Sequence, residues 1–310
     1  MAKRSVSELA ARYCVTDGSA FHLADHDPGD SWGLDIKDQA KGLLKQGVEQ
    51  LSELQERLYA QDKYSVLLIF QAMDAAGKDS TIKHVMSGVN PQGCEVHAFK
   101  SPSSEELDHD FLWRTSKVLP RRGHIGIFNR SYYEETLVVR VHPEILARQQ
   151  LPEAVVTADI WKGRFEDINA FEKYLTRQGV IVRKFFLHVS KEEQKQRFLK
   201  RLGEPEKNWK FSLADVHERE HFDDYMRAYE DCIRQTATPW APWHVIPADK
   251  KWFARLAVAA AIIDTIEALN PQFPEIDPKL KQDFKVAKAA LQTEGPTRGP
   301  RRPATRAVRR

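Results

Sequence analysis

The amino-acid sequence predicts an α/β protein in which a mostly parallel sheet of about five strands lies between two layers of helices. Apolar runs of strand length alternate along the chain with segments whose apolar residues recur at helical spacing. Polar and charged motifs follow several of the strands. In sheets of this kind ligands bind at the carboxyl ends of the strands. We therefore expect a three-layer sandwich with its functional site at those ends.

The predicted strands are short apolar segments bounded by polar or turn-forming residues. They cover residues 65–73, 94–100, 124–130, 180–189 and 243–248. The first, SVLLIFQAM, is apolar almost throughout, which is typical of a strand covered by helices on both faces. Residues 1–35 show no clear period, and we expect them to be loop-like.

Apolar residues at helical spacing predict helices over 36–60, 79–86, 161–175 and 252–269. Two further helix starts carry a Ser followed three residues later by a Glu, the pattern of a capping box. In the first, Ser103 and Glu106 precede apolar residues that continue to Leu119. In the second, Ser190 and Glu193 precede a basic helix.

The composition indicates a reduced, cytoplasmic protein without membrane association. The 310 residues are 42% hydrophobic, which provides enough apolar material for a substantial core. The apolar stretch 256–263 is too short to span a bilayer, and the N-terminal residues lack the apolar core of a secretory signal. Cys14, Cys94 and Cys232 are widely separated and form no metal-binding pair, which favours reduced thiols.

The charge is unevenly distributed. The formal net charge is +3, but residues 294–310 contain six arginines and one glutamate, so the rest of the chain carries about −2. A polyanion site in the body must therefore come from local clusters of Lys and Arg. The 294–310 tail is rich in Pro and Gly and has no apolar face, and we expect it to be disordered.

The segment AMDAAGKDST, residues 72–81, has the setting of a phosphate-binding loop between a strand and a helix. Gly77 and Lys78 match the motif GxxxxGK, but Ala72 replaces its first Gly, and Asp79 stands where a magnesium-binding hydroxyl is expected. Backbone N–H groups at such a helix start attract phosphate, and Lys78 adds a positive charge. A carboxylate such as Asp74 has a function in this anion-binding loop if it binds Mg²⁺ or accepts a proton. An ordinary Ala-rich turn, with Asp79 capping the helix, is the alternative.

Four long segments together resemble the polyphosphate kinase 2 family, from about residue 25 to residue 270. They read QAMDAAGKDSTIKHVMSGVNPQG, FLWRTSKVLPRRGHIGIFNRSYYEETLVVRVH, PEKNWKFS and APWHVIPADKKW. The resemblance implies a thymidylate-kinase-like P-loop domain with a helical lid. It also implies reversible, Mg²⁺-dependent transfer of phosphoryl groups between inorganic polyphosphate and nucleotides, with Mn²⁺ as an alternative metal. Homo-oligomers, dimers or tetramers, are implied as well.

The resemblance assigns roles to residues at the strand ends. It implies that Asp74 holds the metal or a proton, that Lys78 and Arg130 bind phosphate, and that Glu134 acts with them in catalysis. The expected phosphate and polyphosphate ligands also include residues of the loop and of two helices: Ala75, Ala76, Gly77, Asp79, Ser80, Lys83, Arg197, Lys200 and Arg201. The expected nucleotide-binding residues are Lys100, Asn129, Arg130 and Glu134.

The form NRSYYEE resembles the class III subgroup, which accepts AMP and ADP and forms ADP and ATP. Much of the family has Asp at the position of Asn129 and Asn at that of Glu134, so we link Glu134 to AMP acceptance. Arg197, Lys200 and Arg201 share a helical face and are interpreted as a row of cations on the lid. A solvated helix face is the alternative.

We divide the chain into four parts. Residues 1–60 form an N-terminal extension and helix, and 61–275 form the phosphotransferase domain, with the lid around 190–215. A C-terminal helix covers 276–293, and the tail follows. The expected partners are polyphosphate, AMP, ADP and ATP, with no specific nucleic acid. An ATP-dependent nucleoside monophosphate kinase and a non-catalytic polyanion binder that uses the basic tail remain as alternative functions.

Overall fold

The computed structural model describes residues 6–34, 37–210 and 212–293, so the predicted disorder of 294–310 lies outside the described residues. The chain divides into two compact units, Met1–Gln272 and Phe273–Arg310. In the second unit the helix α13 (Pro278–Thr293) exposes all of its residues, including Leu280, Phe284 and Leu291. None of the described helices is long and apolar enough to cross a bilayer.

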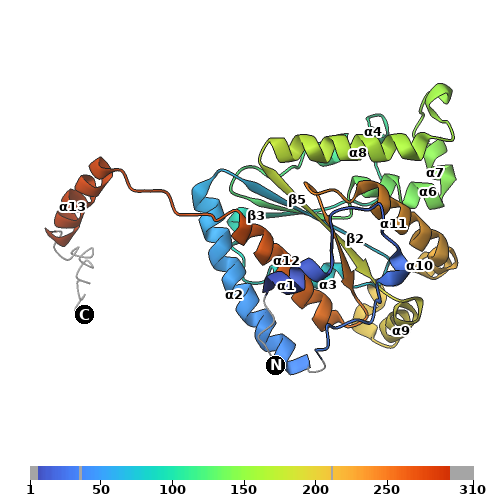
Figure 1. Cartoon of the computed structure of the whole chain (residues 1–310), viewed down its shortest axis with the longest axis horizontal. Coiled ribbons are helices and arrows are strands. Elements are labelled where there is room, and N and C mark those ends of the chain that lie inside the picture. Colours follow the sequence, from blue (N-terminus) through green and yellow to red (C-terminus); the bar gives the residue numbers. More distant parts are fainter. Residues whose placement is uncertain (1–5, 35–36, 211, 294–310) are drawn as a thin grey trace, which may run out of the picture. The chain divides into compact units, whose positions relative to one another are not determined.

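The first unit is built on one six-stranded sheet with the order β1-β6-β5-β2-β4-β3 (Figure 1). Its strands are β1 (Cys14–Val15), β2 (Ser65–Ala72), β3 (Cys94–Ala98), β4 (Ile125–Asn129), β5 (Val180–His188) and β6 (Trp243–Pro247). The strands β2 to β6 pair in parallel, so the five predicted strands and their common direction are confirmed. The additional strand β1 pairs antiparallel with β6 at one end of the sheet, and its two residues are too few to show a period.

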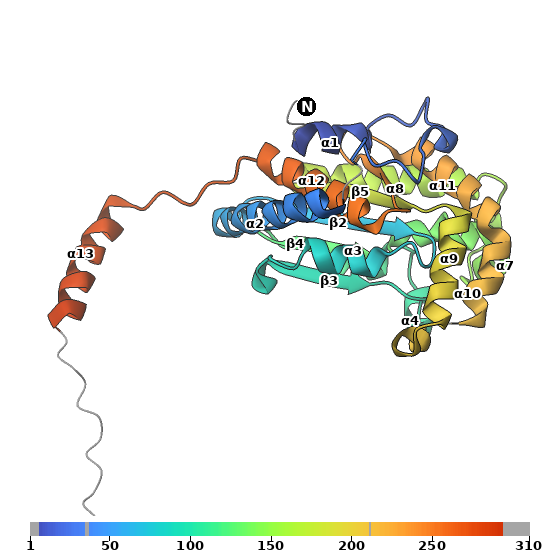
Figure 2. The same cartoon turned by 90° about the horizontal axis from the view of Figure 1, so that it is seen from below.

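Helices cover both faces of this sheet, which confirms the three-layer α/β architecture (Figures 1 and 2). One layer contains α1 (Val6–Arg12), α2 (Lys37–Gln61), α3 (Lys78–Val85) and α12 (Lys251–Ala268), and the other contains α6 (Val138–Val141), α8 (Ile160–Arg177) and α11 (Phe222–Thr236). Shorter or peripheral helices are α4 (Ser104–Leu107), α5 (Trp113–Ser116), α7 (Pro143–Ala147), α9 (Lys191–Leu202) and α10 (Leu213–Glu218). The helix α1 forms within residues that we expected to be loop-like.

Only one of the two predicted capping boxes forms in full. At α4 both halves form, because Ser103 Oγ accepts from the Glu106 N–H and the Ser103 N–H donates to Glu106 Oε2. The helix ends at Leu107 instead of continuing to Leu119, and just beyond it the side chain of Asp110 accepts a hydrogen bond from the N–H of Leu112. At α9 only Ser190 caps. The carboxylate of Glu193 pairs with Arg197 instead, at 2.8 Å.

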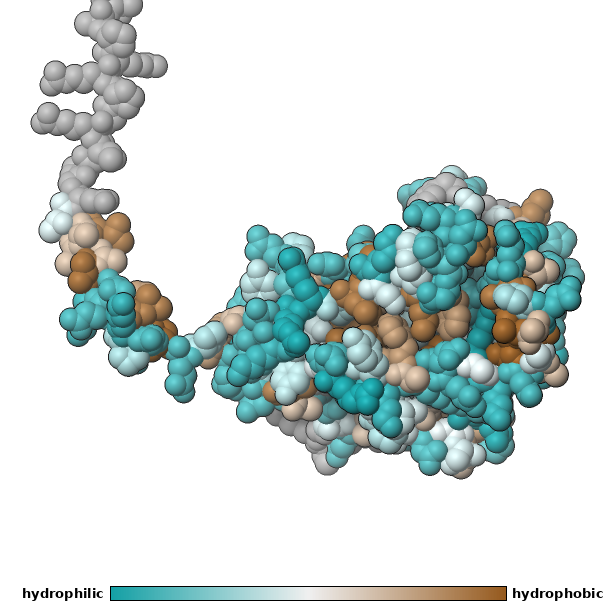
Figure 3. Space-filling view, turned by 90° about the horizontal axis from the view of Figure 1, so that it is seen from above, coloured by the Kyte–Doolittle hydropathy of each residue, from teal (hydrophilic) through white to brown (hydrophobic). Residues whose placement is uncertain are grey.

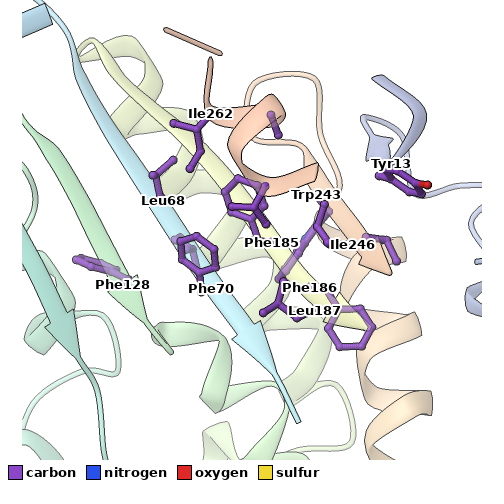
Figure 4. Close-up of a cluster of buried hydrophobic side chains, with 14 of the residues drawn as sticks. Tyr13, Leu68, Phe70, Phe128, Phe185, Phe186, Leu187, Trp243, Ile246 and Ile262 are labelled. Carbon is purple, nitrogen blue, oxygen red and sulfur yellow. The ribbon is translucent and has the colours of Figure 1, made fainter. Parts of the chain in front are cut away.

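The core lies where the central strands meet the two helical layers (Figure 4). Phe70 of β2 and Phe185 of β5 stack with their ring centroids 4.8 Å apart, and Phe128 and Trp243 are fully buried beside them. The strand β2 is buried along Ser65–Gln71, as expected for a strand covered on both faces. Outside the core, the face shown in Figure 3 is mostly hydrophilic, with apolar residues gathered in a few patches.

A buried ion pair fixes the segment that follows β4. Lys184 of β5 donates to Glu172 of α8 at 2.6 Å, and both side chains have 0% exposure. Lys184 Nζ also donates to the Tyr133 hydroxyl and to the carbonyl oxygen of Thr236, while Glu172 accepts from the hydroxyls of Tyr132 and Tyr133. Burial lowers the pKa of Lys184, and Glu172 opposes this shift. Since Tyr132 and Tyr133 lie two and three residues after Arg130 in the chain, the network holds that residue's segment against the sheet.

The substitution Lys184→Met tests this network. It leaves the Glu172 carboxylate buried without its cation, and we expect a loss of about 3–5 kcal/mol in the free energy of unfolding. The measurement is urea denaturation of the wild type and the variant. In the double variant Lys184→Met/Glu172→Leu the uncompensated charge is gone, so it should lose less stability than Lys184→Met alone. Equal losses in the single and double variants would contradict this explanation.

Candidate active site

The loop between β2 and α3 lies at the carboxyl end of the central strand. We call residues 73–77 the phosphate loop. Gly77 has φ 102° and Ala75 has φ 62°. Glycine adopts this left-handed conformation freely, whereas a residue with a Cβ atom is strained there by about 1–3 kcal/mol. Such strain at Ala75 persists only where surrounding contacts hold the backbone in place.

Those contacts come from α9. Gln194 Nε2 donates to the carbonyl oxygen of Asp74 at 2.9 Å, and Arg197 Nη1 donates to those of Ala75 and Ala76 at 3.1 and 2.6 Å. The other nitrogen, Nη2, donates to the carbonyl oxygens of Ala248 and Asp249 in the connection between β6 and α12. The carbonyl dipoles of the loop therefore point toward α9, and the loop can present N–H groups to an anion.

The three lid cations therefore do not form one exposed row. Arg197 is 7% exposed and faces the underside of the phosphate loop. Lys200 is exposed and lies 3.8 Å from Glu204, and Arg201 lies 3.5 Å from Asp215. The helical spacing correctly indicated a common face, but that face packs against two loops at Arg197 and reaches solvent only further along the helix.

Arg130 brings the catalytic candidates together. It follows β4 with φ 65°, and its N–H donates to the carbonyl oxygen of Phe70 on β2. Its guanidinium donates to Asp74 at 3.2 Å and lies 3.5 Å from Glu134. Glu134 also accepts from Gln71 Nε2 at 3.0 Å. The charge of Glu134, and then that of Asp74, raises the pKa of Arg130. One arginine thus links the loop acid to the acid after β4.

Lys78 lies half-buried at the start of α3, beside this group. Burial lowers the pKa of its ammonium, Arg130 acts in the same direction, and Glu134, Asp74 and Asp79 oppose the shift. A bound phosphate would add negative charge here and favour the ammonium form. Lys78 is therefore placed among groups that make its charge sensitive to an anionic ligand.

The remaining candidates divide between the site and its surroundings. Asp79 does not cap α3, because Gly77 is the capping position, and its carboxylate accepts from Asn129 Nδ2 at 2.9 Å. Ser80 Oγ donates to the carbonyl oxygen of Gly77. Lys83 is exposed on α3. Lys100 follows β3, is exposed and lines a small cavity.

Two cavities adjoin this group of charges. The larger, about 500 Å³, is the loop cavity, lined by Asp74, Arg130 and Glu134 and by residues of the helices opposite. The smaller, about 160 Å³, is the side cavity, lined by Lys100, Arg130, Glu134 and apolar residues that include Leu107. Arg130 and Glu134 therefore lie in the wall common to both cavities.

Sequence reasoning missed several residues that line the loop cavity. They are His142, Arg148, Asp215, Glu218, Tyr225 and Tyr229. Glu218 of α10 hydrogen bonds with His142 Nε2 at 2.7 Å and accepts from the hydroxyl of Tyr225, so it connects α10 with the segments beside it. Burial, and then the charge of Asp74, raises the pKa of Asp215. No motif marks these residues, because they come from separate segments of the chain that only the fold brings together.

The arrangement matches known proteins over most of the chain. The family model described as Polyphosphate kinase 2 matches residues 34–274. An ADP-polyphosphate phosphotransferase of Rhodopseudomonas palustris is 53% identical over 249 residues, which cover 80% of this chain and 86% of the relative. An AMP/ADP-polyphosphate phosphotransferase of Meiothermus ruber is 42% identical over 265 residues, which cover 85% of this chain and 95% of the relative.

A solved structure agrees with the sequence relatives. The crystal structure of polyphosphate kinase 2 from Arthrobacter aurescens superposes with a TM-score of 0.81 at 40% identity, and the match covers 92% of this chain and 97% of that one. Family model, relatives and structure therefore each match most of this chain. The chain belongs to the polyphosphate kinase 2 family.

Proposed function

We propose that this protein transfers phosphoryl groups reversibly between inorganic polyphosphate and the nucleotides AMP and ADP, and forms ADP and ATP. The observation that carries the proposal is Arg130, which bonds to Asp74 of the phosphate loop and lies beside Glu134, next to Lys78. Phosphoryl transfer asks for alignment and neutralised charge rather than covalent chemistry from the protein. The names of the Rhodopseudomonas and Meiothermus relatives support polyphosphate as one substrate and adenine nucleotides as the other.

Each charged group has a task in this reaction. The N–H groups of the phosphate loop and Lys78 bind phosphate oxygens of the donor, and Arg130 neutralises charge on the group that is transferred. Asp74 acts at the oxygen of the acceptor nucleotide that attacks the phosphoryl group, because a carboxylate there can accept a proton. Arg197 acts beneath the loop and holds its carbonyl groups away from the phosphates. Lys200 and Arg201 remain candidates for more distant phosphates of the polymer.

The residues present fit a divalent metal. The side chain of Asp74 is 37% exposed and lines the loop cavity. Magnesium at phosphoryl-transfer sites takes one or two carboxylates together with phosphate oxygens and water, so Asp74 would hold Mg²⁺, and Mn²⁺ uses similar oxygen ligands. When bound, the ion would neutralise phosphate charge.

Glu134 is the residue that we connect with AMP acceptance. Gln71 and Arg130 hold its carboxylate from two sides, in the wall between the two cavities. An acid fixed at this position can organise water or a second cation around a short acceptor. The Meiothermus relative, whose name includes AMP, supports this extension of the acceptor range.

Compartment and assembly are part of the proposal. The thiols of Cys14, Cys94 and Cys232 are unpaired, which supports a reducing, cytoplasmic compartment. We propose a homo-oligomer, a dimer or tetramer, on the family resemblance alone. Size-exclusion chromatography with light scattering measures it directly.

The first activity test is Asp74→Ala. We expect ATP formation from AMP and from ADP, with long-chain polyphosphate and Mg²⁺, to fall by about 10²-fold or more, because the variant lacks the carboxylate at the loop. The exposed Asp17→Ala is the matched control and should keep wild-type rates. Full activity in Asp74→Ala would show that Asp74 does not have the role proposed for it. A wild type that uses ATP but not polyphosphate as donor indicates a nucleoside monophosphate kinase instead.

The acceptor range is tested with Glu134→Asn and Glu134→Gln. We expect turnover of AMP to fall relative to turnover of ADP by about tenfold, because the fixed negative charge is lost. The Gln variant keeps the length of the side chain, so it separates the effect of charge from that of packing against Gln71. The ratio of the initial rates with AMP and ADP is the measurement. If that ratio stays at its wild-type value, Glu134 does not set the acceptor range.

The loop-supporting role of Arg197 is tested with Arg197→Lys. A lysine keeps the charge but cannot bond to both pairs of carbonyl groups, so the phosphate loop should lose its fixed position. We expect kcat/KM for polyphosphate to fall by about tenfold or more, since small displacements at a reacting centre are costly. Lys195→Ala, an exposed residue of the same helix, is the control. Wild-type kinetics in Arg197→Lys would show that the loop holds its conformation without these bonds.

A further inference from the structure

Arg148 differs from the other arginines around the two cavities. It caps the carboxyl end of α7 and is exposed. Arg130 is engaged by Asp74 and Glu134, and Arg114 donates to the carbonyl oxygen of Lys100. Among the residues that the structure describes, no hydrogen bond or ion pair engages the side chain of Arg148. Its charge is therefore available to a ligand.

The position of Arg148 is central to both cavities. The loop cavity and the side cavity share a wall formed by Ser101, Arg130, Glu134, Val138, Ile145 and Arg148. The loop cavity continues from this wall to Asp74 and the phosphate loop. The side cavity continues to Pro102 and Leu107, which offer an apolar surface to a nucleoside. A nucleotide that spans the two cavities would place its phosphate at the shared wall.

The many carboxylates of the loop cavity favour a second arginine there beside any metal ion held by Asp74. Its lining includes the carboxylates of Asp74, Glu134, Asp215 and Glu218. Arg130 already shares its charge with two of them, so an entering phosphate meets more negative than positive charge unless another cation takes part. An arginine suits this task, because its planar guanidinium binds two phosphate oxygens at once.

We propose that Arg148 binds the phosphate of the acceptor nucleotide, in the wall that the loop cavity shares with the side cavity. This role rests on the proposed function and adds to it a residue that binds one substrate only. The donor polyphosphate is bound by Lys78 and the loop, whereas the acceptor is bound between Arg130 and Arg148. Loss of Arg148 therefore weakens binding of AMP and ADP and leaves binding of polyphosphate unchanged.

The test compares Arg148→Ala, Arg148→Lys and the control Arg177→Ala with the wild type. Arg177 is exposed at the end of α8 and lines neither cavity. In Arg148→Ala we expect the KM for AMP and ADP to rise by about tenfold or more, as for the loss of a charged hydrogen-bond donor, while the KM for polyphosphate changes by less than about twofold. The KM of Arg148→Lys for AMP and ADP should lie between those of Arg148→Ala and the wild type, and the KM of Arg177→Ala should match that of the wild type.

Calorimetric titration with AMP in the absence of polyphosphate separates this role from the reaction itself. Weaker AMP binding in Arg148→Ala supports the proposal even if the wild type fails to use polyphosphate, in which case only the proposed function falls. The proposal is overturned if the Ala variant binds AMP as tightly as the wild type, or if the wild type binds no AMP. An equal rise in the KM for polyphosphate overturns it as well, because that result indicates a general disturbance of the site.

Discussion

The bonds from Arg197 to four carbonyl oxygens are the constraint on which the site depends. They tie the phosphate loop to the connection between β6 and α12, and so join loops that follow two separate strands of the sheet. Ala75 adopts a left-handed conformation that is unfavourable for it, and the donors from α9 hold the loop there. A buried guanidinium with its donors satisfied by carbonyl groups and by Glu193 meets the requirement that a buried charge be hydrogen bonded.

A second group of contacts supports the opposite side of the site. The ion pair of Lys184 and Glu172 binds the hydroxyl of Tyr133, which follows Arg130 closely in the chain. The N–H of Arg130 bonds to β2, so its side chain leaves the sheet at a defined point between Asp74 and Glu134. The charged groups of the candidate site are therefore placed by buried polar networks behind them, and preorganised catalysis requires such support.

The N-terminal residues also belong to this support, although their sequence shows no period. The carbonyl oxygen of Pro28 accepts from the Asp249 N–H, and Lys250 Nζ donates to Ser31 Oγ. These contacts reach the same connection that Arg197 ties to the phosphate loop. The segment lies before residue 34, where the match to the family model begins. Irregular backbone of this kind is held by scattered single bonds, which leave no repeating pattern in the sequence.

The sequence by itself determined the five parallel strands, the long helices and the position of the phosphate loop, because these depend on local apolar spacing and on a motif within ten residues. It also indicated Asp74, Lys78, Arg130 and Glu134, which the fold brings together. Only the tertiary structure decided which cations are buried and which line the cavities. Helical spacing places residues on a common face, but the neighbour that this face meets is set by packing between distant segments, so Arg197 became a buried support and Arg148 a free cation in the cavity wall.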